Sequence, residues 1–240
     1  DRVYQEALAH LCQSLKAGRD VAEVMIEIRR TFDQIPVEGV GERPLVGIVG
    51  EIYTRANRFA NENVVTQLEE LGAEVWMPPI SEWILYVNHT GMASAWRRRA
   101  LKNFLGLALT DHVQRKIEHR LAEPFKGAIR NLHEPTIRET LSRARPYIHH
   151  SFEGEAPLSV GKSADFVKHG ASGLVNVMPF TCMPGTIVNA VLKRFREEHG
   201  NLPYLALACD GQEQTNTRVR LEAFMHQVKQ RHARQTGRKD

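Results

Sequence analysis

Apolar residues recur at steps of three and four along the start of the chain, which is the period of an amphipathic helix. Gly18 interrupts this pattern, and Asp20 is a residue type that commonly caps a helix N-terminus. Two N-terminal helices are therefore predicted within residues 1–35, packing on the domain that follows. Pro36 to Pro44 has the turn-rich composition of a linker. The periodic apolar positions are Val3, Leu8, Leu11, Leu15, Val21, Val24, Met25 and Ile28.

After the linker, short apolar runs alternate with amphipathic segments, which predicts an α/β domain over residues 45–235. The runs are bounded by turn residues, as expected of strands buried on both faces. They lie at 45–49, 73–77, 174–178 and 202–209. Helices are expected at 61–71, 157–169, 187–199 and 216–231. Strand–helix–strand order favours right-handed crossovers and parallel pairing, so the expected fold is a flavodoxin-like parallel sheet of about four strands flanked by helices.

A helical insertion is predicted between the second and third strands, at about 81–147. The helical period continues from Ser81 to Leu121, which is too long for one crossover helix. Two or more helices are therefore expected, with Gly91 and Gly106 as break points. The apolar face of this stretch is formed by Trp83, Leu85, Tyr86, Trp96, Leu101, Phe104, Leu105, Leu109, Val113, Ile117 and Leu121.

Composition places the chain among ordinary globular proteins. Hydrophobic residues make up 42% and charged residues 25% of the 240 positions, and no apolar run approaches the ~20 residues of a membrane helix. No membrane partner is therefore expected. The first residue is Asp1 and not Met, which predicts an excised or processed piece. Three cysteines without a CxxC pair favour a reducing, cytoplasmic location.

The basic residues are concentrated in two places. One is Arg97–Arg99 with Lys102, and the other is the tail from Lys229 to Lys239. The net charge is only +4, and runs of this kind usually form solvated helix faces. Nucleic-acid binding, which would require steeply salt-dependent affinity, is therefore the least favoured function.

Two segments resemble nucleotide-binding motifs, but each lacks a required feature. Gly161-Lys162-Ser163 resembles the end of a phosphate-binding P-loop, but the glycine that this motif requires is replaced by Ala156. Gly39-Val40-Gly41 precedes a strand instead of following one, so it lacks the context of a dinucleotide fingerprint. No nucleophile elbow and no histidines at zinc-binding spacing are present.

Cys182 is the residue that most favours a specific chemistry. It lies where the third strand should end and a helix should begin, at the edge where open α/β sheets bind ligands. A helix N-terminus favours the thiolate, which is the form that binds metal. The alternative is that Cys182 is a packed small hydrophobe. Cys209 and Cys12 favour the packed role more strongly.

Polar residues follow the other strands at the same predicted edge. Glu51 and Tyr53 come after the first strand, and Asp210 and Asn216 come after the fourth. A ligand crevice needs such residues, and we expect these four to line it. Asp210 or Asn216 could equally cap a helix.

Several segments resemble the second domain of the 2-hydroxyacyl-CoA dehydratase family, closest to its activase and activase-related branch. The resemblance extends from Leu45 to Phe224 and is most specific in the last two segments. The segments are Leu45-Val46-Gly47-Ile48-Val49-Gly50-Glu51-Ile52-Tyr53 with Asn57, Leu68 to Val75, Ser81 to Tyr86, Val177-Met178-Pro179-Phe180-Thr181-Cys182-Met183-Pro184-Gly185-Thr186, and Asp210-Gly211-Gln212-Glu213 with Asn216 and Arg220 to Phe224.

The resemblance implies a 4Fe–4S cluster held by cysteines from two α/β domains, with Cys182 in the position of the second domain's ligand. It also implies radical dehydration of a 2-hydroxyacyl-CoA, started by an electron from an ATP-hydrolysing activase. The other cysteine ligands of the family lie in a preceding domain, and Cys12 has no matching segment. A cluster needs about four ligands, so this chain alone is expected to bind it weakly or not at all.

The sequence therefore predicts part of a cluster-binding, dehydratase-like electron-transfer protein. The implied partners are a preceding cluster-binding domain or partner subunit, an activase and an acyl-CoA. The alternative is a non-catalytic interaction or small-ligand domain that keeps this fold without a cluster.

Overall fold

The structure is a computed structural model that describes residues 2–129, 131–210 and 216–237. The chain divides into two compact units. The helical unit comprises Asp1–Val40 and Ile84–Glu134, and the sheet unit comprises Gly41–Trp83 and Pro135–Asp240. The candidate site belongs to the sheet unit.

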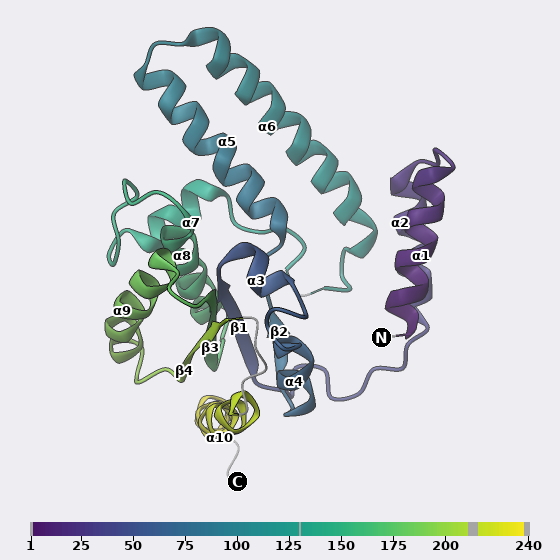
Figure 1. Ribbon diagram of the computed structural model, residues 1–240. Coiled ribbons are helices and arrows are strands. Elements are labelled where there is room, and N and C mark those ends of the chain that lie inside the picture. Colours follow the sequence, from purple (N-terminus) through teal and green to yellow (C-terminus); the bar gives the residue numbers. More distant parts are fainter. Residues whose placement is uncertain (1, 130, 211–215, 238–240) are drawn as a thin grey trace. The chain divides into compact units, whose positions relative to one another are not determined.

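A four-stranded, all-parallel sheet is the centre of the sheet unit (Figure 1). Its strands are β1 (Leu45–Gly50), β2 (Glu74–Trp76), β3 (Gly173–Pro179) and β4 (Tyr204–Cys209). They lie in the order β2-β1-β3-β4. The prediction of a flavodoxin-like α/β fold with about four parallel strands and a helical insertion between the second and third is confirmed.

Helices cover both faces of the sheet because alternate strand residues point to opposite sides. Leu45 and Val49 of β1 join one hydrophobic cluster, and Val46 and Ile48 join the other. The first cluster includes residues of α8 (Glu155–Lys168) and α9 (Met183–Glu198), and the second includes residues of α4 (Val64–Glu70) and α10 (Thr217–Thr236). The unit also contains α3 (Ile52–Ala56) and α7 (Ile137–Ala144).

Gly161 allows α8 to approach α7 closely. A Cβ atom at this position would lie 2.2 Å from the carbonyl oxygen of Thr140 on α7. Gly161 is fully inside α8, and Lys162 and Ser163 beside it are buried. The glycine of the incomplete P-loop motif therefore serves helix packing.

The helical unit contains α1 (Arg2–Lys16), α2 (Val21–Asp33), most of α5 (Ile80–Arg97), α6 (Leu101–Ala122) and the short 3-10 helix η1 (Glu123–Phe125). The predicted separation of the first two helices is confirmed: Gly18 has a φ of +69°, and the Asp20 side chain caps α2 by accepting the N–H of Ala22. α2 contacts both α6 and η1. Asp20 also forms an ion pair with Arg120 of α6.

The predicted helix breaks at Gly91 and Gly106 are wrong. The chain instead turns between Arg97 and Leu101, where Arg99 adopts a left-handed φ of +56°. Gly91 lies within α5, and its missing side chain makes room for Leu107, which lies 3.1 Å from where a Cβ atom would be. Gly106 lies within α6 with nothing within 4 Å of its Cβ position.

After α6, the predicted insertion contains η1 and α7 among its described residues up to Tyr147. Two further expectations are corrected. The helix predicted at 61–71 begins at Val64, and the five-residue helix α3 precedes it. The apolar face predicted for the insertion is not wholly buried. Its exposed members are Trp96, Leu101, Leu105, Leu109, Val113 and Ile117.

Replacing Gly161 with Ala should destabilise the sheet unit. Alanine raises helix propensity by about 1 kcal/mol, but overpacking against the Thr140 carbonyl should cost about 1–3 kcal/mol or more. Gly106→Ala is the matched control, because it makes the same change in an open helical position. In urea unfolding followed by circular dichroism, Gly161→Ala should be the less stable variant. Equal stability of the two would contradict the packing role.

Candidate functional site

The carboxyl edge of the sheet has the topology that favours a ligand crevice. From β1 the chain continues to β2 on one side, whereas β3 continues to β4 on the other. The loops after β1 and β3 therefore diverge at a topological switch point. Both loops are tied to the sheet: Glu51 N donates to Val177 O at 2.9 Å, and Phe180 N donates to Cys209 O at 2.8 Å.

Cys182 is the N-cap of α9, as predicted for a thiol just ahead of a helix. Its sulfur accepts the backbone N–H of Gly185 at 3.4 Å, and the residue is half-buried. Gly185 is needed here because a Cβ atom would lie 2.4 Å from the sulfur of Met178 on β3. Close packing of α9 on β3 thus holds Cys182 at the switch point. Its role as a metal ligand remains a prediction.

Asn176 fixes the start of α9 from within the sheet. It is fully buried in β3, and its Nδ2 donates to Asn189 Oδ1 at 2.8 Å and to Gly185 O at 3.3 Å. Tyr204 of β4 donates its hydroxyl to the same Asn189 oxygen. A series of hydrogen bonds therefore connects the middle of the sheet to the helix that Cys182 caps.

Glu51 has a structural task at the edge. It is the N-cap of α3, and its carboxylate accepts the N–H groups of Tyr53 at 3.1 Å and Thr54 at 2.7 Å. Burial opposes ionisation of Glu51, but the hydrogen bonds from Thr54 and Tyr53 outweigh it and lower the pKa of this carboxyl group. Glu51 is therefore a fixed negative charge at the carboxyl end of β1 near neutral pH.

The other predicted crevice residues lie near the same edge. Tyr53 is 68% exposed, and its hydroxyl accepts Asn57 Nδ2 at 2.6 Å. Asp210 directly follows β4 and is exposed. Asn216 occupies the N-cap position of α10 without a side-chain capping bond. Glu51, Cys182 and Asp210 thus follow three adjacent strands, whereas Gln212 and Glu213 lie outside the described residues.

Cys209 differs from Cys182 in its surroundings. It packs against the hydrophobic cluster that α4 and α10 cover. Burial, with the negative charges of Glu62 and Asp210, raises the pKa of the Cys209 thiol to about 11. It is therefore protonated near neutral pH. Within residues 2–129, 131–210 and 216–237, no group of three or more His, Cys, Asp or Glu side chains could hold a metal ion.

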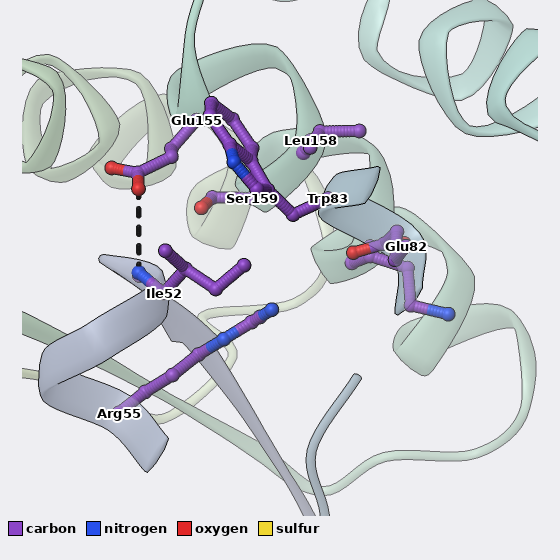
Figure 2. Close-up of a pocket in the computed structure, with 9 residues that line it drawn as sticks. Ile52, Arg55, Glu82, Trp83, Glu155, Leu158 and Ser159 are labelled. Atoms are coloured by element: carbon purple, nitrogen blue, oxygen red, sulfur yellow. Dashed lines mark hydrogen bonds between the residues drawn. The ribbon is translucent and has the colours of Figure 1, made fainter. Parts of the chain in front are cut away.

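Beside β1 lies a cluster of buried charges that the sequence pattern did not predict. Lys162 is 1% exposed, Glu82 4% and Arg55 6%. Figure 2 shows Arg55 extending from α3 toward Glu82 at the start of α5. Together with Glu155 they line a cavity of about 10 Å³, which is room for about one water molecule. The remaining residues that line it are Gly50, Ile52, Trp83, Leu158 and Ser159.

Lys162 is held by both charge and aromatic rings. Its Nζ lies 3.3 Å from the carboxylate of Asp165, which is also 1% exposed, and Asp165 lies 2.9 Å from Arg143. The same ammonium group lies 5.5 Å from the ring centroid of Trp76 and 5.4 Å from that of Phe166. These contacts join α7, α8 and β2.

Glu155 is an acid of the cavity with a raised pKa. Burial is the main cause of this rise. The hydrogen bond from the Ile52 N–H, at 3.3 Å, lowers the pKa, and the negative charge of Glu51 raises it further. The dashed line in Figure 2 marks the bond from Ile52. The cavity has room for one water molecule. The charged residues around it hold α3, α8 and the start of α5 beside the carboxyl end of β1. The only sequence signal for it was Lys162 in the incomplete P-loop motif.

Replacing Asp165 with Asn should strongly destabilise the sheet unit. It would remove the carboxylate that pairs with the buried ammonium of Lys162, and breaking a buried pair in this way typically costs about 3–5 kcal/mol. Glu222→Gln is the control, because the Arg218–Glu222 pair is about half exposed and such pairs contribute about 0–1 kcal/mol. Urea unfolding of both variants provides the measurement, and equal losses would contradict the importance of the buried pair.

Cys209 should react with alkylating agents only at high pH. With its pKa at about 11, the thiolate fraction rises about tenfold for each pH unit below that value. The rate of iodoacetamide modification should be measured in Cys12→Ser/Cys182→Ser, where Cys209 is the remaining cysteine. A rate that reaches its plateau near pH 9 would show that burial does not protect this thiol.

Comparisons with protein-family models, curated proteins and solved structures found no match to this chain. The site itself offers an N-capping thiol after β3, a fixed carboxylate after the adjacent strand β1 and a buried charge cluster beside β1.

Proposed function

We propose that the sheet unit contributes Cys182 as one ligand of a 4Fe–4S cluster shared with a second domain or subunit, within a dehydratase-like electron-transfer protein. The position of Cys182 is the main support. It lies at the switch point of the sheet, and its sulfur accepts an N–H at the start of the 16-residue helix α9. Open α/β sheets bind their ligands at such a switch point.

This chain can supply one ligand of such a cluster but not all of them. A 4Fe–4S cluster requires about four ligands, mostly thiolates. Cys209 is a protonated thiol near neutral pH because of burial, and Cys12 is an exposed residue of α1 in the other unit. The remaining ligands would come from the partner domain or subunit. When bound, the cluster would supply one-electron transfer.

The roles of this chain's other residues follow from their positions. Glu51 holds α3 and presents a fixed negative charge. We propose that it lines the crevice together with Tyr53, Asp210 and Asn216. An acyl-CoA, implied by the family resemblance, is the proposed ligand of the crevice, and an ATP-hydrolysing activase is the proposed electron donor.

A second candidate is a small-ligand or interaction domain without a cluster. One observation favours it: the Cys182 sulfur already accepts the N–H of Gly185, as a helix cap does. On this proposal the switch-point crevice binds its ligand directly, and Cys182 serves as a helix cap.

The two proposals differ in the effect of Cys182→Ala. The test uses the product of the complete gene, purified anaerobically and reconstituted with iron and sulfide. Cluster ligation predicts that Cys182→Ala loses most of the visible absorbance and at least about half of the bound iron, because a 4Fe–4S cluster depends on about four ligands.

Cys12→Ala is the matched control and should keep the iron and absorbance of the wild type. If Cys182→Ala also keeps them, Cys182 is not a ligand. A colourless wild-type protein after reconstitution would favour the second candidate.

A further inference from the structure

α5 and α6 form an antiparallel hairpin within the helical unit (Figure 1). Three contacts define its inner side. Asn88 donates to Gln114 Oε1 at 2.6 Å, Gly91 lies against Leu107, and the rings of Trp96 and Phe104 are 5.6 Å apart. These pairs progress in opposite directions along the two helices, so the hairpin is packed along its length.

The outer side of α6 carries an exposed apolar stripe. Its members are spaced by four residues, so neighbours lie on one face of the helix. Leu105 and Leu109 are each 65% exposed. The full stripe is Leu101, Leu105, Leu109, Val113 and Ile117.

Basic residues border this stripe. Lys102 and Lys116 are exposed on α6, and Arg120, also exposed, pairs with Asp20 just before α2. The two acids of α6, Asp111 and Glu118, are half-buried, and Asp111 pairs with Arg115 at 2.8 Å. The outer face of α6 therefore combines aliphatic side chains with positive charge.

The tip of the hairpin extends the same pattern. Arg97, Arg98 and Arg99 are exposed next to Trp96, which is 65% exposed. The sequence contains no Asp or Glu from Ile84 to Thr110. An exposed indole beside guanidinium groups is the combination found where proteins meet the headgroup layer of a bilayer.

We propose that the α5–α6 hairpin binds the surface of an anionic membrane, with α6 lying in the interfacial plane. Charge complementarity attracts the basic tip to anionic headgroups. The aliphatic stripe and Trp96 enter the boundary between headgroups and acyl chains, while the lysine and arginine stems reach back to the headgroups. A nucleic-acid partner would match the basic residues and leave the aliphatic stripe in water.

This proposal replaces the expectation that no membrane is involved. That expectation rested on the lack of a long apolar run, and within the described residues no helix is long and apolar enough to cross a bilayer. An interfacial helix needs no such run, because it buries only one face. With 22 residues, α6 would extend about 33 Å along the surface.

The test is sedimentation of the 240-residue chain with vesicles of phosphatidylcholine alone or mixed with phosphatidylserine. Binding should require phosphatidylserine and weaken with added salt. Arg97→Gln/Arg98→Gln/Arg99→Gln should reduce partitioning about a hundredfold, since each basic residue near the surface contributes about fivefold. Lys168→Gln/Lys193→Gln/Lys229→Gln removes the same charge from exposed positions of the sheet unit and should change partitioning only a few-fold.

A second pair of variants tests the apolar contact. Leu105→Gln/Leu109→Gln should reduce partitioning by about tenfold or more, with an unchanged circular dichroism spectrum because both side chains are exposed. Trp96→Phe should keep most of the binding and lose the blue shift of tryptophan fluorescence that vesicles cause.

Three results would overturn the proposal. The first is no binding to phosphatidylserine vesicles, including the case in which duplex DNA binds instead. The second is an equal loss in the arginine and lysine triple variants. The third is full binding by the leucine variant, which would show that surface charge alone accounts for the interaction.

Discussion

The buried pair of Lys162 and Asp165 is the constraint on which the sheet unit most depends. Two opposite charges removed from water are stable only while they stay in contact and hydrogen-bonded. Asp165 also faces Arg143 of α7, and Lys162 lies near the rings of Trp76 and Phe166. Lys162 and Asp165 both belong to α8, so movement of this helix away from β2 or α7 would leave their pair intact but would separate Lys162 from Trp76 and Asp165 from Arg143. These contacts restrict how α8 can sit on the sheet.

This constraint extends to the candidate site. Lys162 lines the small cavity beside β1 together with Arg55 and Glu82, and Arg55 belongs to the helix that Glu51 caps. On the neighbouring strand, Asn176 ties β3 to α9 and so to Cys182. Buried polar contacts thus position the loops on the two sides of the switch point. The hydrophobic clusters alone would leave these loops more freedom of position.

The strands were predictable from sequence because burial on both faces leaves continuous apolar runs such as Leu45–Gly50. The place of Cys182 before α9 was predictable for a local reason, since the Pro184–Gly185 pair follows it at a helix start. The buried charges were not predictable. Lys162, Glu82 and Arg55 have the residue types of a solvated helix face, and only tertiary contacts show that they are buried.

Two other features depend on contacts that local patterns do not encode. Helix α3 is five residues long and relies on the Glu51 cap, so it shows no helical period. The turn between α5 and α6 uses a left-handed arginine, Arg99, in a position where glycine is the usual signal. Within the candidate site, sequence located the residues at the carboxyl edge of the sheet and favoured the packed role for Cys209, which packs against a hydrophobic cluster.

The amide of Asn176 also has a consequence for how the sheet assembles. Strand β3 lies between β1 and β4 and is almost wholly apolar, so its side chains alone discriminate weakly between alternative alignments. A shift by one residue would carry this amide to the opposite face, among Leu221, Phe224 and other hydrocarbon side chains, where it would lose Asn189. One carboxamide therefore penalises misaligned folding intermediates and helps select a single native pairing.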